Sequence, residues 1–236
     1  MLNKPKPTNT NVRLQRKKPI FFFGEDKDEV ANKHFPQKSI LQYYAIYKPF
    51  QMLCQFSPEG DKQTLANFNF TFSKDIYPVG RLDYDSEGLL ILSNDKALNN
   101  LLLNPKKKHQ RQYWVQVEGI PTHDFFSKIE KGVSISIDGQ NHKTLPTKCR
   151  LLTDDEIKII PERNPPIRFR KNISDTWIAL TLTEGKNRQV RKMTAACGFP
   201  TLRLIRFSIE KLYLPIFKPN EIIEIDASKI NQLLNL

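Results

Sequence analysis

The segment Gly80–Leu90 combines residue types that can do chemistry. It holds a basic residue, Arg81, and two carboxylates, Asp83 and Asp85, directly before the apolar run Leu89–Leu92. Reacting groups are often carried by polar loops whose ends are fixed by buried strands. Either aspartate could act as a nucleophile or a base, and the pair could bind a divalent cation. The alternative is purely structural, because loop aspartates commonly bond to the backbone or to a neighbouring arginine.

Two further segments could meet that loop. Tyr113 begins an alternating apolar pattern that continues through Val115 and Val117, which predicts a half-buried strand. A tyrosine on such a face is most often part of the core. The other segment, Glu184–Met193, opens a basic stretch, where an arginine at a strand-to-helix turn could bind a carboxylate or phosphate. A solvated helix face is the alternative. Six basic residues and no acidic one lie between positions 186 and 206: Lys186, Arg188, Arg191, Lys192, Arg203 and Arg206.

Several other chemistries lack their residue patterns. The four histidines are scattered and the three cysteines form no Cys-x-x-Cys pair, so neither a zinc site nor a disulfide framework is predicted. The sequence contains no Gly-x-x-x-x-Gly-Lys phosphate loop and no Gly-x-Ser-x-Gly nucleophile motif. No apolar run approaches the roughly 18 residues that a membrane helix needs. Because the cysteine pattern suits a reducing compartment, we expect a cytoplasmic protein without a membrane segment.

The overall charge favours a polyanionic partner. The 236 residues include 37 Lys+Arg and 25 Asp+Glu, which give a net charge of +12 and a pI near 9.6. Such an excess favours nucleic acid, through phosphate contacts and counterion release. The alternative is a lysine-rich surface without a special partner. Residues 1–39 are predicted to be a disordered basic arm, because they carry few large apolar side chains. The folded domain is expected to cover residues 40–236.

The residue patterns also indicate a fold class. Strands are expected at Tyr43–Tyr47, Leu89–Leu92, Tyr113–Val117, Val133–Ile137, Lys148–Leu152, Ile178–Leu182, Leu202–Leu204 and Ile222–Ile225. Helices are expected around Ala97–Leu102, Phe125–Ile129 and Val190–Cys197. Short strands mixed irregularly with a few helices predict an α+β fold with a largely antiparallel sheet, and not a doubly wound nucleotide-binding fold.

Three motifs together resemble a known family. Gly80-Arg81-Leu82-Asp83, followed by Ser86-x-Gly88-Leu89-Leu90, is similar to the catalytic motif of RNA pseudouridine synthases of the RsuA/RluE type. Arg111-Gln112-Tyr113 resembles the family's basic-x-Tyr motif, and Glu184–Met193 resembles its third motif. Their order and spacing agree with the family, and the similarity extends from about Tyr44 to Ile225. It is greatest to the RluE branch, which modifies a uridine of 23S rRNA.

The resemblance implies a fold and a reaction. The fold would be one catalytic domain on a mostly antiparallel mixed sheet flanked by helices, with two subdomains around a basic cleft. The enzyme would break the glycosidic bond of a flipped-out uridine, rotate the base and rejoin it through carbon, without cofactor or metal. Asp83 would be the nucleophile, with attack at ribose C1′ or at the uracil ring left open. Arg191 would pair with Asp83 and keep it ionised, while Tyr113 would stack on the uracil and move a proton.

The remaining site residues are expected to bind RNA. By resemblance, Arg81 would fill the gap that the flipped nucleotide leaves, and Leu182 would form the apolar floor under the base. The segment before Ile40 lacks the apolar periodicity of the small RNA-binding domain that many relatives carry, so the basic surface, including Lys106–Lys108, must supply affinity. The partner would be 23S rRNA, free or in a pre-ribosomal particle, and the protein would be a monomer. The basic residues expected to contact RNA are Lys186, Arg188, Arg203 and Arg206.

Two other function classes stay open at this point. A non-catalytic RNA-binding or ribosome-assembly protein with the same fold would bind RNA and would not depend on Asp83. An Asp-x-Asp metal-dependent nuclease or transferase would need a divalent ion for activity. The two classes therefore differ in whether Asp83 and Asp85 are needed for activity and whether a divalent ion is.

Overall fold

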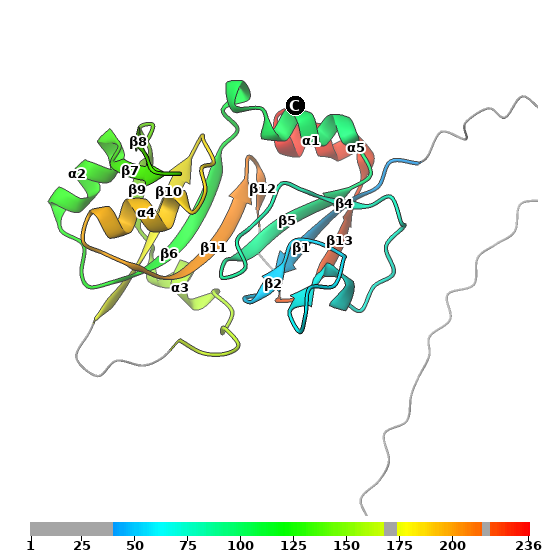
Figure 1. The fold of residues 1–236 in the computed structure, drawn as a ribbon, viewed down its shortest axis with the longest axis horizontal. Coiled ribbons are helices and arrows are strands. Elements are labelled where there is room, and N and C mark those ends of the chain that lie inside the picture. Colours follow the sequence, from blue (N-terminus) through cyan, green and yellow to red (C-terminus); the bar gives the residue numbers. More distant parts are fainter. Residues whose placement is uncertain (1–39, 168–173, 214–217) are drawn as a thin grey trace, which may run out of the picture. The chain divides into compact units, whose positions relative to one another are not determined.

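A nine-stranded mixed sheet forms the centre of the computed structural model, which describes residues 40–167, 174–213 and 218–236 (Figure 1). The strands across the sheet are β13 (Ile222–Ile225), β1 (Tyr43–Lys48), β5 (Glu87–Ser93), β11 (Thr201–Ile209), β6 (Arg111–Glu118), β10 (Asp175–Leu182) and β9 (Lys148–Leu151), with β4 (Tyr77–Val79) beside β5 and β12 (Leu212–Tyr213) beside β11. All pairings in this sheet are antiparallel except that of β5 with β11. The expected α+β fold with a mostly antiparallel sheet is confirmed. The predicted basic arm, residues 1–39, lies outside the described residues.

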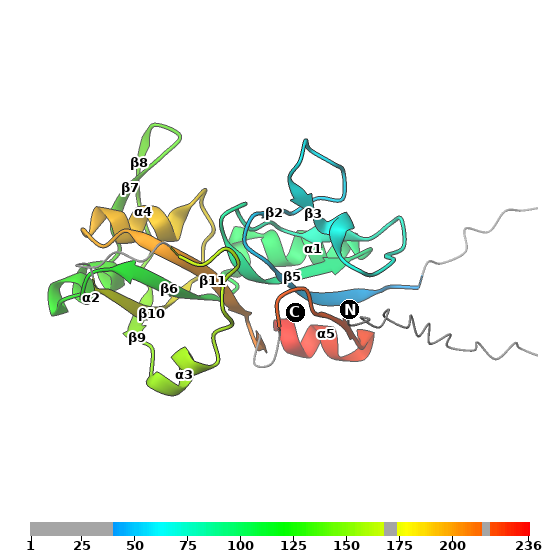
Figure 2. The same cartoon turned by 90° about the horizontal axis from the view of Figure 1, so that it is seen from below.

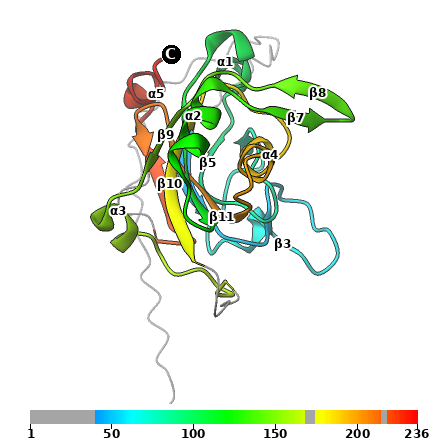
Figure 3. The same ribbon diagram turned by 90° about the vertical axis from the view of Figure 1, so that its left-hand side faces the viewer.

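Helices and two small sheets cover the central sheet. The helices are α1 (Lys96–Leu103), α2 (His123–Lys131), α3 (Asp154–Lys158), α4 (Gln189–Ala196) and α5 (Ala227–Leu234), with short 3-10 helices η1 (Leu65–Asn67) and η2 (Pro105–Lys107). The small sheets are β2 (Met52–Leu53) with β3 (Gln63–Thr64), and the hairpin β7 (Ser134–Ile137) with β8 (Gln140–Lys143). Figure 2 shows α4 and the hairpin on one side of the sheet and α3 and α5 on the other, and Figure 3 shows β3 on the same side as α4. Within the described residues, no helix has the length and apolar character to cross a membrane.

The sheet divides into two halves at the pairing of β5 with β11. This pairing consists of two residue pairs, Glu87 with Ile205 and Gly88 with Arg206. One half, which we call the Asp83 half, contains β13, β1, β5 and β4. The other, the Tyr113 half, contains β11, β6, β10 and β9. These halves correspond to the two expected subdomains.

The sheet has one hydrophobic core on its first face and two on its second face, and only the two cores of the second face are divided between the halves. Side chains alternate between the faces of a strand, and one core extends over the first face of both halves, with members such as Tyr43, Leu89, Ile91, Trp114 and Ala179. On the second face there are two separate cores. One lies in the Tyr113 half and includes Val115, Leu180, Leu182, Val190 and Met193. The other lies in the Asp83 half and includes Tyr44, Ile46, Leu82, Leu90 and Leu92. Tyr113 packs against both of these cores and therefore lies at their border.

Candidate active site

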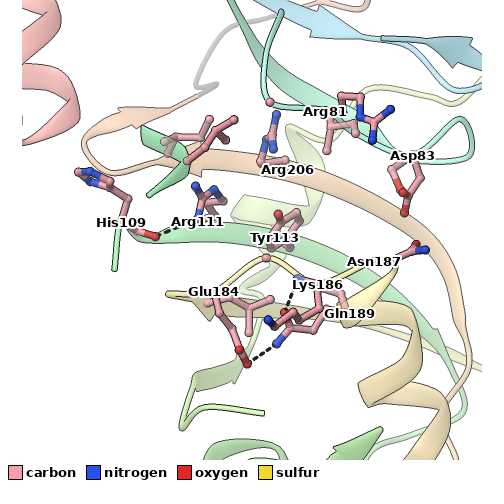
Figure 4. A pocket seen from close by; sticks show the side chains of 18 of the residues that line it. Arg81, Asp83, His109, Arg111, Tyr113, Glu184, Lys186, Asn187, Gln189 and Arg206 are labelled. Atoms are coloured by element: carbon pink, nitrogen blue, oxygen red, sulfur yellow. Dashed lines mark hydrogen bonds between the residues drawn. The ribbon is translucent and has the colours of Figure 1, made fainter. Parts of the chain in front are cut away.

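A pocket of about 950 Å³ is lined by residues from both halves of the sheet (Figure 4). Its walls come from the loop between β4 and β5, from β6, from the end of β10 and from the start of α4, so the three sequence motifs meet at one place. Figure 4 shows Asp83 toward one end of this pocket and His109 toward the other. Seven of the nine predicted site residues line it: Arg81, Asp83, Tyr113, Leu182, Lys186, Arg188 and Arg206. The other two, Arg191 and Arg203, are not among the residues that line it.

Asp83 is held by its backbone, and its carboxylate forms only a long ion pair among the described residues. The Ser86 amide donates to the Asp83 carbonyl at 3.0 Å, and the amide of the buried Leu82 donates to Cys54 Sγ at 3.2 Å. The Asp83 side chain is 35% exposed. No described residue donates a hydrogen bond to its carboxylate; Arg188 Nη1 lies 3.8 Å from Oδ2. A carboxylate that is fixed in place and has unoccupied lone pairs is suited to act as a nucleophile.

The neighbouring aspartate, Asp85, binds the two arginines of the third motif. Arg188 donates to both Asp85 oxygens at 2.9 Å. Arg191 lies with Nε 3.4 Å from Asp85 Oδ2, and its Nη2 donates to the Asp85 carbonyl at 2.6 Å. The expected direct pairing of Arg191 with Asp83 is therefore not observed, because α4 approaches the loop at Asp85. The charge of Arg191 still acts on Asp83 through space.

Burial and charge together set the protonation of this cluster. Burial opposes ionisation of Asp85, but hydrogen bonds from Arg188 and the charge of Arg191 outweigh it and lower the Asp85 pKa below its usual value. Those hydrogen bonds also raise the pKa of Arg188. Burial lowers the pKa of Arg191, although the charge of Asp85 opposes this. The Asp85 carboxylate and the guanidinium groups of Arg188 and Arg191 are therefore charged at neutral pH.

Tyr113 and apolar side chains form a flat wall beside the Asp83 loop. Tyr113 is partly buried on β6, between Leu180 of β10 and Arg206 of β11. Leu182, at the end of β10, is 3% exposed, and Leu204 also lines the pocket. An aromatic ring and aliphatic side chains can hold a planar base by stacking and burial.

The start of α4 is fixed by a network that sequence reasoning missed. Glu184 Oε1 accepts hydrogen bonds from the Leu145 amide at 2.8 Å and from Gln189 Nε2 at 2.7 Å, and Glu184 Oε2 lies 3.1 Å from His142 Nε2. Gln189 Oε1 accepts from the Lys186 amide at 3.0 Å, a hydrogen bond drawn in Figure 4. Lys186 and Arg188 are consequently held at the mouth of the pocket. No sequence signal joins Glu184 to His142, which comes from a distant hairpin.

Two further arginines line the pocket, the buried Arg206 and the partly buried Arg111. Arg206 is 4% exposed; its Nε donates to the Leu89 carbonyl at 2.8 Å, and its Nη2 has no partner among the described residues. Arg111 donates to the carbonyls of Leu102 at 2.8 Å and His109 at 3.3 Å, and burial lowers its pKa. Arg206 was expected to contact RNA, and it does line the pocket, but as part of its wall and not of the outer surface.

Arg203 forms a buried ion pair inside the sheet. It is 6% exposed and donates to both oxygens of Glu87, with Nε–Oε1 at 2.7 Å and Nη2–Oε2 at 2.8 Å. Tyr47 Oη donates to Glu87 Oε2 at 3.1 Å. The predicted RNA contact of Arg203 stays a prediction, but in this structure its guanidinium is buried and already bound to Glu87.

Lys48 is a buried cation that sequence reasoning also missed. It is fully buried at the end of β1, where Nζ donates to the carbonyls of Pro49 at 2.9 Å and Met52 at 2.8 Å. Burial lowers the pKa of Lys48 to about 8, although nearby acidic groups, including Asp85 and Asp83, oppose this shift. The signal that could have identified it is a lysine that follows five consecutive apolar or aromatic residues, Tyr43–Tyr47.

The hydrogen bonds of Asp85 also bear on the Asp-x-Asp metal hypothesis. Both Asp85 oxygens already accept hydrogen bonds from Arg188, so they are not oriented toward a shared ion with Asp83. Metal-binding carboxylates need unoccupied oxygens that converge on one point. Among the residues that the structure describes, no group of three His, Cys, Asp or Glu side chains could hold a metal ion.

Comparisons with known proteins agree with the geometry. The family model of RNA pseudouridylate synthase matches residues 42–196. Ribosomal large subunit pseudouridine synthase E of Vibrio parahaemolyticus is 41% identical over 216 residues, which cover 92% of this chain and 87% of that protein. The synthase of the same name from Xanthomonas axonopodis is 45% identical over 176 residues, which cover 74% of this chain and 88% of the relative.

A solved structure shows the same fold. The crystal structure of a pseudouridylate synthase matches 84% of this chain and 75% of its own, with a TM-score of 0.66 and 24% sequence identity. The family model covers more than half of the chain, and relatives above 40% identity cover most of it. The protein therefore belongs to the RNA pseudouridylate synthase family.

Proposed function

We propose that this protein converts a uridine of large-subunit ribosomal RNA to pseudouridine. One observation carries the proposal: the Asp83 carboxylate, the Tyr113 ring and the start of α4 line a single pocket in a member of the pseudouridine synthase family. Two relatives that cover most of the chain carry names that assign them to the large ribosomal subunit. The geometry of the pocket supports a role for each of its side chains.

Asp83 is the nucleophile in this proposal. Its carboxylate is partly exposed at the pocket and carries no hydrogen bond from a described residue. The guanidinium groups of Arg188 and Arg191 interact with its charge, and Arg188 Nη1 lies 3.8 Å from Oδ2. The carboxylate attacks the target uridine, at ribose C1′ or at the uracil ring, and is released when the base has rejoined the ribose through carbon.

The wall of the pocket holds the base while it turns. Tyr113 stacks on the uracil, and its hydroxyl serves as the base that moves a proton within the ribose. Leu182 forms the apolar floor. Stacking needs only a planar face, so the uracil can rotate against this wall and stay in contact with it.

The rim of the pocket binds the RNA strand. Arg81, Lys186 and Arg188 are exposed and line the pocket, where they can contact phosphates or fill the gap left by the flipped uridine. Flipping a nucleotide costs a few kcal/mol, which stacking and phosphate contacts offset. The exposed Lys106–Lys108 lie next to this rim, because Asn104 and Pro105 line the same pocket.

The cellular setting completes the proposal. We propose that the enzyme works as a cytoplasmic monomer on 23S rRNA, either free or in a pre-ribosomal particle. Residues 1–39 are proposed to act as a basic arm that adds RNA affinity to the catalytic domain. Because the reaction rearranges bonds within one nucleotide, the proposed chemistry uses the residues of the pocket alone.

Pseudouridine mapping of 23S rRNA tests the proposal. RNA from cells without the gene should lack one pseudouridine, which wild-type protein restores and Asp83→Asn does not. Asp83→Asn should lower the rate by roughly 10⁴-fold or more, as for other enzymes without their nucleophile, while Asp75→Asn, a surface change outside the pocket, should restore the modification. An Asp83→Asn protein that still formed pseudouridine would exclude this mechanism.

Three further outcomes would favour another function or another substrate. RNA binding without turnover by the wild-type protein would favour the non-catalytic RNA-binding role. Loss of turnover in EDTA would favour a metal-dependent reaction. A change confined to tRNA would overturn the assignment of the substrate.

A further inference from the structure

The backbone on both sides of Asp83 is held by one neighbouring segment, which follows β1. Before Asp83, the Leu82 amide donates to Cys54 Sγ at 3.2 Å, and the Cys54 thiol donates to the Leu82 carbonyl at 3.3 Å. After Asp83, the Gln51 amide donates to the Tyr84 carbonyl at 2.9 Å. Of these contacts, only the two at Leu82 depend on a side chain, that of Cys54.

The Cys54 thiol supplies both hydrogen-bond partners of one backbone residue. A thiol has one hydrogen to donate and a sulfur atom that accepts, and both are used on Leu82. Cys54 and Leu82 are each 9% exposed. Among the described residues, no other hydrogen bond reaches the amide or the carbonyl of Leu82. Since buried backbone groups need a partner, removal of the thiol would leave both groups of Leu82 unpaired.

The segment that carries Cys54 is itself fixed. The fully buried Lys48 donates from Nζ to the carbonyls of Pro49 at 2.9 Å and Met52 at 2.8 Å. Cys54 directly follows β2, which pairs with β3. The sulfur atom is therefore attached to a segment with its own hydrogen bonds, and it can hold the Leu82 peptide in place.

We propose that Cys54 is a positioning residue that fixes the Asp83 carboxylate in the pocket through the backbone of Leu82. The inference rests on the proposed role of Asp83 as nucleophile. The Leu82 carbonyl belongs to the peptide group that leads into Asp83, so a shift of that group moves the Asp83 side chain. Cys54 lines the pocket, but its donor and its acceptor are both bound to Leu82, so it acts through the loop and not on the RNA.

The proposal gives Cys54 a role in rate and not in RNA affinity. Displacement of a reacting group by about 1 Å can lower a rate by about a hundredfold. Cys54→Ala, which removes both hydrogen bonds, should therefore lower kcat at saturating RNA by about ten- to a hundredfold. KM for RNA should stay within about threefold, because the exposed basic residues at the rim of the pocket are unchanged.

Two other substitutions at the same position test the cause of this lower rate. Cys54→Ser keeps one donor and one acceptor and should recover most of the wild-type kcat. Cys54→Val removes the hydrogen bonds without leaving a cavity and should show the same loss as Cys54→Ala. The loss of rate should therefore follow the hydrogen bonds and not the volume of the side chain.

The matched control is a second buried cysteine. Cys149 is also 9% exposed, lies in the core of the Tyr113 half and does not line the pocket. Its thiol makes no hydrogen bond to the residues that the structure describes. Cys149→Ala should therefore lower stability in urea unfolding and leave kcat and KM unchanged, which separates a general loss of stability from a loss of position.

Hydrogen exchange tests the contact without reference to activity. The Leu82 amide is bound to sulfur in the wild-type protein, and loss of one hydrogen bond is worth about a tenfold change in an opening equilibrium. The Leu82 amide should exchange about ten times faster in Cys54→Ala than in wild type. It should exchange at the wild-type rate in Cys149→Ala.

The rate is measured as single-turnover and steady-state formation of pseudouridine on a 23S rRNA fragment that contains the modified site. A wild-type kcat in both Cys54→Ala and Cys54→Val, a loss of rate no larger than in Cys149→Ala, or unchanged exchange of the Leu82 amide would overturn the proposal. Wild-type protein without turnover would instead contradict the proposed function. Hydrogen exchange does not depend on turnover, so the two failures are distinguishable.

Discussion

Replacement of Gly88 by alanine is expected to disrupt the pairing that joins the two halves of the sheet. Gly88 has φ +106°, in the region that L side chains rarely adopt. A Cβ atom at this position would lie 2.4 Å from the Arg206 carbonyl oxygen and 2.7 Å from the Arg206 amide nitrogen. Both are backbone atoms of the adjacent strand, so neither can move aside without displacing β11.

The size of the effect is the sum of two costs. A non-glycine residue at an unfavourable φ costs about 1–3 kcal/mol, and forcing an extra carbon into a packed region costs about another 1–3 kcal/mol. Gly88→Ala should therefore lower the free energy of unfolding by about 2–6 kcal/mol, a large part of the roughly 5–15 kcal/mol typical of native proteins. Gly139→Ala separates the two costs, since Gly139 has φ +80° and no atom within 4 Å of an added Cβ.

Urea unfolding and single-turnover kinetics test this expectation together. Gly139→Ala should show only the backbone cost and wild-type kcat, because Gly139 lies at the tip of a hairpin. Gly88→Ala should be less stable than Gly139→Ala. Its folded fraction should also react more slowly, because the strand that follows the Asp83 loop would shift relative to the Tyr113 half. If the two variants were destabilised equally, the close approach of β5 and β11 would not have the energetic weight assigned to it.

Three other perturbations have defined outcomes. The pKa of Lys48 is about 8 in the folded protein, below the usual lysine value of 10.5. Between these two pH values the unfolded chain binds more protons than the folded one, so the free energy of unfolding should rise with pH. Unfolding measured across this pH range should show the rise in wild type and not in Lys48→Met. Arg203→Met should destabilise by about 3–5 kcal/mol because Glu87 is left buried and unpaired, and adding Glu87→Gln should recover part of that stability in urea unfolding. Replacement of all three residues Lys106–Lys108 by alanine should weaken RNA binding. The slope of log K against log salt concentration should become shallower by about 0.7 for each phosphate of single-stranded RNA that is no longer neutralised. An unchanged slope in filter binding would show that these lysines do not contact RNA.

The positions of the main strands and of the reacting loop could be predicted from local patterns. Alternating or continuous apolar residues identified β1, β5, β6 and β10, and most of the predicted strand ends lie within two residues of the observed ones. This is possible because a strand buried on one face has alternating apolar residues and a strand buried on both faces has consecutive ones. The Asp83 loop was recognisable since it combines charged residues with an adjacent buried strand. Helix α3 was missed although Thr153 and Glu156 form a capping box that is visible in the sequence.

The partners of charged residues could not be predicted, because they depend on strand order. Arg203 and Arg206 are three residues apart and look alike in the sequence, yet one pairs with Glu87 and the other donates to the Leu89 carbonyl. Both interactions follow from the parallel pairing of β5 with β11, which joins segments more than 100 residues apart. The preference of Arg191 for Asp85 similarly depends on where α4 approaches the loop, which no local pattern specifies.

The pairing of β1 with β13 has a consequence for synthesis of the chain. The Asp83 half takes its edge strand, Ile222–Ile225, and the helix Ala227–Leu234 from residues that are translated late, whereas the four strands of the Tyr113 half are complete once Ile209 has been added. Contacts can form during synthesis only between segments that have already been made, and chains are made from the N-terminus. A growing chain can therefore assemble the Tyr113 half of the sheet first. The Asp83 half is complete only after the later strand and helix have also left the ribosome that makes them.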